Sequence, residues 1–462
     1  MRISIQYFTL LLLIFCSAAC SDPEPEFTDP INGEDIEETD PDPIDPDPTA
    51  DYLNYDSDAI FNQDSLPSFY IELSETALNF INDDPTAEEY VAGSITYNGE
   101  TISPVGVRYK GSIGAYIGCV SGINVFNPNG SKTCTKLSMK IKFNWNENSE
   151  KFYGLKKLQL HSMNNDKSQM RDRLAYKLFE DMGVAAPRCI HAKVYINGEY
   201  NGLFALVEQI DGRFSRYHFD GGEGNIYKEI WPVDDLAKAQ PEASYREALR
   251  TNEDDNPDVS LMRSFGEEIQ NTSASGMKAV VEKWMDVDQT IAYCVVDRGI
   301  KHDDGPFHWY CTGDRCSNHN YYWYEDPDDK KFYLVAWDMD NAFENWTEFN
   351  GVTGLPDDWG ETSNNCEPFS GSFWGFSQKS AACDKLTAAW TTYENEYETK
   401  KQLFKNQYIT AARIDQLLSE WSNQIEAATQ EAFDAHGDAI SISEWEGAKE
   451  DLKQQMALSR NN

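Results

Sequence analysis

Positive charge is scarce in this chain. No Lys or Arg occurs between Arg2 and Arg108, and the 462 residues include 39 Lys and Arg against 78 Asp and Glu, a net charge of −39. A surface this acidic repels the phosphate backbone of DNA and RNA. We therefore exclude nucleic-acid polymers as partners and expect a soluble exported protein, long enough to bury a core without metal or disulfide support.

Long hydrophobic runs are absent too, since no stretch reaches the ~18 apolar residues of a membrane span. Residues 7–15 form a shorter apolar segment, which follows Arg2 and precedes three small residues at 17–19. This order is typical of a secretory signal, so we predict one over residues 1–20. The small residues lead directly into Cys20, which resembles a bacterial lipobox with Cys20 as the lipidated first residue. Ordinary cleavage that leaves Cys20 unmodified is the alternative.

The segment after Cys20 has the composition of a tether. Residues 21–48 contain twelve acids, seven prolines and no Lys or Arg. Such a segment does not collapse, so we predict an extended tether over residues 21–50, with a calcium-binding tail as the alternative. The acidic run at 21–24 resembles the surface-export signal of some Gram-negative lipoproteins. We thus expect an exported bacterial lipoprotein, at the outer membrane or cell surface, that touches the membrane only through the lipid on Cys20.

Cysteine pairs with the CxxC spacing of zinc sites are missing. Eight cysteines remain after Cys20, and an even number in an exported protein is typical of disulfides. Cys189 and Cys294 lie in apolar patterns, which fit either buried thiols or a fourth bridge. The sequence alone does not fix the connectivity, but three pairs close in sequence are the candidates: Cys119 with Cys134, Cys311 with Cys316, and Cys366 with Cys383.

Hydrophobic patterns and turn residues predict strands first and helices later. Asn98-Gly99 and Asn197-Gly198 each separate two alternating segments, as in a hairpin with a type I′ turn. Past residue 230 the pattern becomes helical, interrupted by a strand pair at 321–325 and 331–337. We predict an α+β fold with a β-rich N-lobe and a mainly helical C-lobe. The helix candidates of the second part are residues 234–250, 261–269, 277–296, 384–404, 409–435 and 442–459.

The few cations of the first half are clustered. Residues 136–143 alternate strictly, so one face of this strand is apolar and the other carries Lys136, Lys140 and Lys142. Arg108 and Lys110 precede it, followed by the glycine-containing segment at 111–114. Arg and Lys together on strands clamp phosphate oxygens, although a solvated strand face is the alternative. Glycines at 111 and 114 allow the backbone to approach a ligand, a weak signal because Gly-Ser also makes ordinary turns.

Two acidic segments are candidates for metal binding and proton transfer. Asp338 and Asp340 follow the apolar strand at 332–336 and project to the same side if that strand continues. Mg²⁺ is satisfied by one or two carboxylates with phosphate oxygens and water, while a helix cap and a turn are the alternative. The sequence His302-Asp303-Asp304-Gly305, followed by His319-Asn320, offers a proton acceptor and a second metal ligand.

The ordered set of these segments resembles the CotH kinase family of secreted, atypical protein-kinase-like proteins. The resemblance covers about residues 65–460, which implies an N-lobe at about 65–211 and a C-lobe at about 212–460. The final helix, with WEGAKEDLKQQMALSR at 445–460, also looks like the end of the family's domain. The other stretches that carry the resemblance are GVRYKGS at 106–112, KLSMKIKF at 136–143, LQLHSMNNDKSQMRDRLAYKLFEDMGVAAP at 158–187, VYINGEYNGLFALVEQID at 194–211, GNIYKE at 224–229, HNYYWY at 319–324 and VAWDMDNAF at 335–343.

The resemblance implies a two-lobed atypical protein-kinase-like fold and transfer of phosphate from ATP to Ser or Thr of an exported protein, with Mg²⁺ or Mn²⁺. It implies that Asp338 is the principal metal ligand, with Asp340 and Asn320 beside it. Lys140 or Lys142 corresponds to the phosphate-clamping lysine. The resemblance also places Glu208 at the hinge. It implies that Asp304 is the aspartate that positions the acceptor hydroxyl, with Asp303 as the second choice. The loop that covers the nucleotide would contain Arg108, Lys110, Gly111 and Ser112.

Two departures from the family bear on activity. His302 stands where the family often has Asn, and residues 306–317, with one cysteine pair, are inserted before His319. Nucleotidyl transfer by the same fold is one alternative function. A non-catalytic adhesion or glycan-binding module is another, in which Trp359 and Trp374 would stack on sugars unless they are packed in the core. Metal-dependent nucleotide binding discriminates between kinase and adhesin.

Overall fold

The structure is a computed structural model. It describes residues 57–461, except 125–126, 147–150, 254–256, 303, 314, 344–365 and 371–376. In this part of the chain no helix is both long and apolar enough to cross a membrane.

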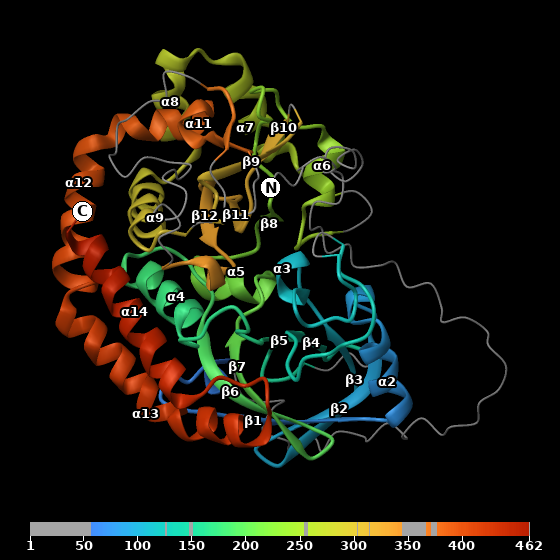
Figure 1. Cartoon of the computed structure of the whole chain (residues 1–462). Helices are drawn as coiled ribbons and strands as arrows, with labels where there is room; N and C mark the ends of the chain where they lie inside the picture. Colours follow the sequence, from blue (N-terminus) through green and yellow to red (C-terminus); the bar gives the residue numbers. More distant parts are fainter. Residues whose placement is uncertain are drawn as a thin grey trace, which may run out of the picture.

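Seven strands of the first part of the chain close into a barrel, in the order β1-β2-β3-β4-β5-β7-β6 (Figure 1). Neighbouring strands are antiparallel except β1 and β6, which are parallel. The strands are β1 (Ser68–Leu73), β2 (Val91–Tyr97), β3 (Glu100–Tyr109), β4 (Met139–Lys142), β5 (Lys157–His161), β6 (Cys189–Ile196) and β7 (Glu199–Val207).

Both Asn-Gly pairs form the predicted hairpin turns. Asn98 and Gly99 have φ angles of 52° and 83°, and Asn197 and Gly198 have 50° and 80°. A type I′ turn needs positive φ at both central residues, which Asn and Gly adopt at low cost. These turns fix the registers of β2 with β3 and of β6 with β7.

Alternation places apolar side chains inside the barrel and polar ones outside. The interior is formed by fully buried residues such as Val107, Ile141 and Leu160. The expected strand at 136–143 is shorter, because β4 begins only at Met139. Lys136 therefore does not share the outer face with Lys140 and Lys142, and the prediction of three cations on that face is wrong. Its ammonium donates to the Leu203 carbonyl oxygen at 2.9 Å instead.

The second part of the chain is mainly helical (Figure 1) and includes two small sheets. Helix α4 (Arg171–Asp181), which connects β5 and β6, belongs to the same hydrophobic core as these helices. The sheets have the orders β12-β11-β8 and β10-β9-β14-β13. The α+β prediction with a β-rich first lobe is confirmed.

The remaining helices and strands, in chain order, are α2 (Glu75–Asp83), α3 (Ile113–Tyr116), α5 (Gly212–His218), β8 (Asn225–Lys228), α6 (Glu242–Glu247), α7 (Ser260–Asn271), α8 (Met277–Trp284), α9 (Val287–Gly299), β9 (His308–Thr312), β10 (Arg315–Ser317), β11 (Tyr321–Asp326), β12 (Lys331–Ala336), β13 (Phe369–Ser370), β14 (Ser377–Ser380), α11 (Lys385–Trp390), α12 (Glu394–Leu403), α13 (Ala411–Ala435) and α14 (Ile442–Asn461).

Three predicted helices differ from the structure. Within 234–250 only α6 is helical, because the Asp234 carboxylate accepts from the Leu236 and Lys238 amides and closes a turn. The helix predicted at 277–296 is divided at Asp286, whose side chain caps α9. The one predicted at 384–404 is divided between α11 and α12. In the first two cases, a polar residue that bonds the nearby backbone overrides the apolar period.

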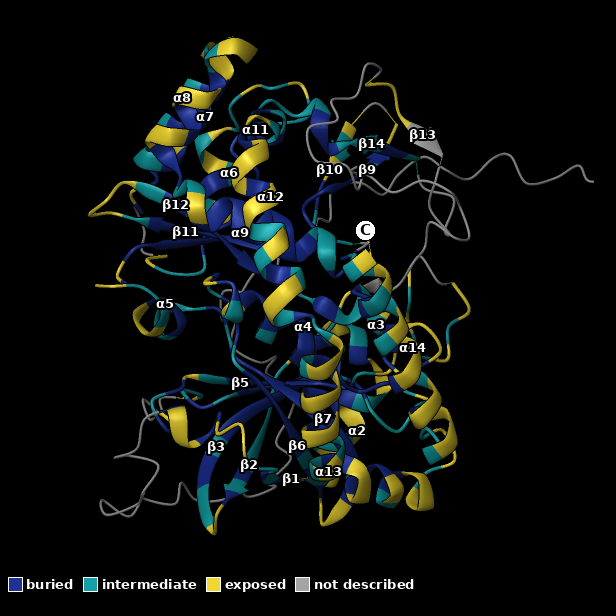
Figure 2. Cartoon of the chain, turned by 90° about the vertical axis from the view of Figure 1, so that its left-hand side faces the viewer, coloured by how far each residue is buried: buried dark blue, intermediate teal, exposed yellow. Residues whose placement is uncertain are grey.

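The C-terminal hairpin of α13 and α14 packs along both parts of the molecule (Figure 2). In the barrel, the Tyr200 hydroxyl donates to the Ala428 carbonyl of α13 at 3.0 Å. Between the hairpin helices, Asp438 accepts from both the amide and the hydroxyl of Thr135 at 2.7 Å. At the other end, the Ser459 hydroxyl donates to the Gly299 carbonyl of α9. The hairpin therefore braces the two lobes against each other.

Candidate functional site

The outer face of the barrel carries a row of polar side chains on three neighbouring strands. Arg108 of β3 pairs with Lys140 of β4, which pairs with Gln159 of β5. All three are buried, and the Gln159 amide nitrogen has no partner among the described residues. Lys142 lies one pair further along the same face, opposite Gly106 and Lys157. The strands thus hold two of the predicted cations, Lys140 and Lys142, on one face beside Arg108.

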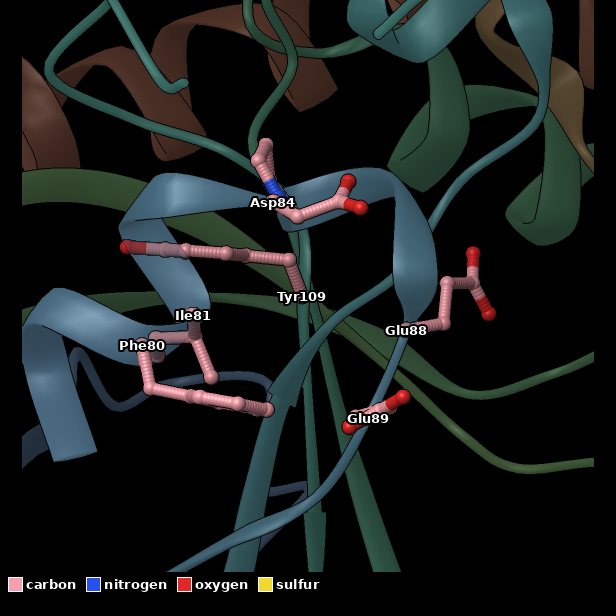
Figure 3. A pocket seen from close by; sticks show the side chains of 7 residues that line it. Phe80, Ile81, Asp84, Glu88, Glu89 and Tyr109 are labelled. Carbon is pink, nitrogen blue, oxygen red and sulfur yellow. The ribbon is translucent and has the colours of Figure 1, made fainter. Parts of the chain in front are cut away.

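The loop after β3 is held by a carboxylate that the sequence analysis did not single out. Glu88 forms an ion pair with Arg108 and accepts from the Gly111 amide at 2.8 Å and from the Tyr116 hydroxyl at 3.3 Å. Figure 3 shows this corner of the barrel, with Glu88 and Glu89 on the segment beside Tyr109 of β3. No local pattern marks Glu88, because its partners lie 20 or more residues away. It holds two of the donors that were assigned to the nucleotide loop.

A chain of hydrogen bonds connects this loop to the segment of Asp338. The Lys110 ammonium lies 2.9 Å from His161 Nε2, and His161 Nδ1 lies 3.1 Å from Asp172 on α4. The other oxygen of Asp172 accepts from the Met339 amide at 3.2 Å. The Lys110 ammonium also lies 5.2 Å from the ring centroid of Trp337. Loop, helix and acidic segment are therefore positioned together. Ser112, next to Gly111, is exposed at the start of α3.

The acidic segment does not continue the strand, so the condition under which Asp338 and Asp340 would project to the same side is not met. β12 ends at Ala336, and Asp338 has left-handed backbone angles, φ 57° and ψ 72°. Its amide donates to the Tyr176 hydroxyl at 3.1 Å, and its carbonyl accepts from His302 Nε2 at 3.1 Å. A non-glycine residue keeps this conformation only when its surroundings fix it. Here α4 and the loop after α9 fix it.

Four carboxylates approach one another at this point: Asp172, Asp304, Asp338 and Asp340. Burial raises the pKa of Asp340 well above its ordinary value, and the charges of the other three raise it further. Burial and the charge of Asp338 likewise raise the pKa of Asp304. Asp304 and Asp340 are each only partly buried as whole residues. Like charges held together in this way favour a bound cation.

Asn320 joins this cluster. Its amide nitrogen donates to the Asp304 carboxylate at 2.9 Å, and its backbone N–H donates to Glu229 at 3.0 Å. The structure thus brings together Asp304, Asn320, Asp338 and Asp340, which lie on three separate segments. Asp303, the second choice for the acceptor aspartate, lies outside the described residues.

His302, the departure from the family's Asn, is a buried support for Asp338. Its Nδ1 donates to Asp297 at 3.1 Å, while Nε2 donates to the Asp338 carbonyl. Burial lowers the pKa of His302, but the hydrogen bond and charge of Asp297 outweigh it and the pKa is raised. Both ring nitrogens of His302 therefore face hydrogen-bond acceptors. Gly305 permits the close packing, since a Cβ there would lie 2.5 Å from His302 Nδ1.

Glu208, at the predicted hinge, is engaged in ion pairs. Its carboxylate lies 2.6 Å from Arg188 and 3.2 Å from His218. Burial raises the pKa of Glu208, but these partners outweigh it and the net pKa is lowered. The side chain thus fixes the connection between the lobes, and the Glu208 backbone N–H donates to the Arg188 carbonyl oxygen at 2.9 Å.

The residues present fit a divalent metal that arrives with phosphate. In the described part of the chain, no three His, Cys, Asp or Glu side chains form a ready-made metal site. Mg²⁺ takes one or two carboxylates and completes its shell with substrate phosphates and water. Asp338 and Asp340, with the Asn320 amide, provide such a partial shell.

The three predicted disulfides are present. Cys119 joins Cys134 between β3 and β4, Cys311 joins Cys316 across β9 and β10, and Cys366 joins Cys383. Cys189 and Cys294 are buried thiols, so they do not form a fourth bridge.

The strand barrel carries outward-facing cations and is joined at Glu208 to a helical lobe. That lobe has a carboxylate cluster directly after a strand. Together these features form a kinase-like arrangement. Residues 107–460 match the family model described as CotH kinase protein, so the chain belongs to the CotH kinase family. Inner spore coat protein H of Bacillus subtilis (strain 168) is 23% identical over 197 residues, which are 41% of this chain and 50% of that protein. The chain thus spans about half the length of this relative.

Proposed function

We propose that this chain is an exported protein kinase that transfers the γ-phosphoryl group of ATP to Ser or Thr of an exported protein. The observation that carries the proposal is the convergence of Asp304, Asn320, Asp338 and Asp340, linked through Asp172 and His161 to the cationic loop. Phosphoryl transfer depends on this pairing of anion-binding and metal-binding groups.

Each group has a distinct task. Asp338, Asp340 and Asn320 would hold Mg²⁺ or Mn²⁺, which neutralises phosphate charge when bound. Lys140 or Lys142, with Lys110, binds phosphate oxygens, and Gly111 and Ser112 cover them. Arg108 and the Gly111 amide become donors to phosphate when Glu88 moves away. Asp304 accepts the proton of the acceptor hydroxyl, and the backbone around Glu208 contacts the adenine.

The proposal includes export and anchoring by a lipid on Cys20, with residues 21–50 as the tether. These residues lie outside the described part, as do Trp359 and Trp374. The name of the Bacillus subtilis relative places that protein in a spore coat, which supports a surface-associated role here. Since ATP is scarce outside cells, we propose that substrates are phosphorylated during export or that another nucleotide is the donor.

The test uses the mature chain with γ-labelled ATP, Mg²⁺ or Mn²⁺ and a generic protein acceptor. Asp338→Ala runs beside Asp328→Ala, a matched control in the exposed turn between β11 and β12. We expect γ label on the acceptor with wild type and control but not with Asp338→Ala. Label from α-labelled ATP would indicate nucleotidyl transfer instead. No label and no ATP-dependent thermal shift would contradict the kinase and favour a binding module.

A further inference from the structure

The inserted segment 306–317 lies in the chain between Asp304 and Asn320. It contains strand β9, which lies in the middle of a sheet between β10 and β14. The disulfide of Cys311 and Cys316 joins β9 to β10. A middle strand with partners on both sides holds its side chains in a fixed register.

Alternation along β9 decides which side chain reaches Asp304. Trp309 and Cys311 are buried, whereas Tyr310 between them is half-buried and points to the opposite face. Tyr310 pairs with Ser317 of β10 and Gln378 of β14, and its ring lies 5.8 Å from the ring of His319. Its hydroxyl forms a hydrogen bond with the Asp304 carboxylate.

We propose that Tyr310 is a positioning residue for phosphoryl transfer, which makes the disulfide-stapled insertion part of the active site. The Tyr310 hydroxyl and the Asn320 amide both donate to Asp304, and two donors from different segments fix the rotation of a carboxylate. The free oxygen lone pairs then point to the acceptor hydroxyl. This inference rests on the proposed function and deepens it.

The position of the disulfide has a functional consequence. Cys311 follows Tyr310 directly and is paired across the hairpin with Cys316. Disulfides form in exported proteins and not in the reducing cytosol. The bridge therefore completes the support of Asp304 only once the chain has left the reducing cytosol, which restricts full activity to the protein in transit or outside the cell.

The test compares Tyr310→Phe with wild type and with Tyr333→Phe, a half-buried tyrosine on β12. Removing one hydrogen bond to a charged group predicts a kcat about tenfold to a hundredfold lower for Tyr310→Phe. The KM for ATP and the Tm are expected to stay unchanged, because the hydroxyl touches neither nucleotide nor core. Tyr333→Phe is expected to keep wild-type kcat.

A second variant tests the insertion as a unit. Cys311→Ser with Cys316→Ser is expected to lower kcat, and adding Tyr310→Phe is expected to cause no further loss. Wild-type kcat in Tyr310→Phe, while Asp304→Asn is inactive, would overturn the inference and leave the kinase intact. A parallel fall of Tm and ATP affinity would assign Tyr310 a structural role and also overturn it. If wild type and Asp304→Asn are equally inactive, the proposed kinase itself is wrong.

Discussion

Glu325 lies in the small sheet of the C-lobe and predicts a measurable dependence of stability on pH. Its carboxylate is buried between Tyr227, whose hydroxyl donates at 2.8 Å, and Asn225, whose amide donates at 3.2 Å. Burial raises the pKa of Glu325 to about 7, and the nearby Asp258 contributes, although the two hydrogen bonds oppose the change. The perturbation we consider is Glu325→Gln, which keeps an oxygen acceptor and removes the charge.

Whether stability rises or falls with pH depends on which chain, folded or unfolded, holds the Glu325 proton. Above pH 4.5 the unfolded chain releases the Glu325 proton while the folded chain retains it, so rising pH favours unfolding. Stability attributable to Glu325 is complete below pH 4.5 and is lost as the pH rises to about 7. From 4.5 to about 7, at 1.36 kcal/mol for each pH unit, the loss is about 3 kcal/mol.

Urea unfolding of wild type and Glu325→Gln between pH 4.5 and 8.5 measures this difference directly. We expect the stability of the variant relative to wild type to increase by about 3 kcal/mol across that interval and then to level off. Glu247→Gln, an exposed site on α6, serves as the control and is expected to show no such change. A difference between wild type and Glu325→Gln that does not vary with pH would refute the reasoning.

Three further predictions concern the loop, the carboxylate cluster and the brace. Glu88→Gln removes the negative charge that pairs with Arg108 and accepts from the Gly111 amide. ATP should therefore bind several-fold more tightly in a calorimetric titration. Unchanged or weaker binding would contradict this. Asp340→Asn relieves repulsion, so without metal its Tm should exceed that of wild type, while Mn²⁺ should no longer raise it. Trp445→Ala empties a fully buried site in the brace and should cost about 3–5 kcal/mol in urea unfolding; a loss below 1 kcal/mol would refute the packing argument.

The strands could be predicted because their signals are local. Asn98-Gly99 and Asn197-Gly198 predict the two hairpin turns. The alternation of apolar and polar residues beside them predicts which face of each strand lies inside the barrel. The helix at 234–250 failed because Asp234 closes a turn by side-chain hydrogen bonds that the apolar period does not reveal. The left-handed backbone of Asp338 after β12 was missed for a similar reason. The strand stops where α4 and His302 bind the backbone of Asp338 and Met339.

The candidate site was accessible from sequence only in its central residues. Asp304, Asn320, Asp338 and Asp340 carry recognisable chemistry at short spacings, and the structure brings them together. Their supports come from distant segments and carry no local signal: Glu88, His161, Asp172, Glu229 and Tyr310. Which carboxylate is a ligand and which is a support depends on tertiary contacts.

Two connections, one inside the site and one on the outer surface, hold the two lobes together. The hydrogen-bonded chain from Lys110 through His161 and Asp172 to Met339 crosses from the barrel to the acidic segment. On the outside, α13 and α14 bond to the barrel at Tyr200 and to α9 at Gly299. A large rotation of the lobes would break both connections together. Movement during a catalytic cycle is therefore expected in the loop of Gly111 and Glu88, which is a local change and does not disturb the brace.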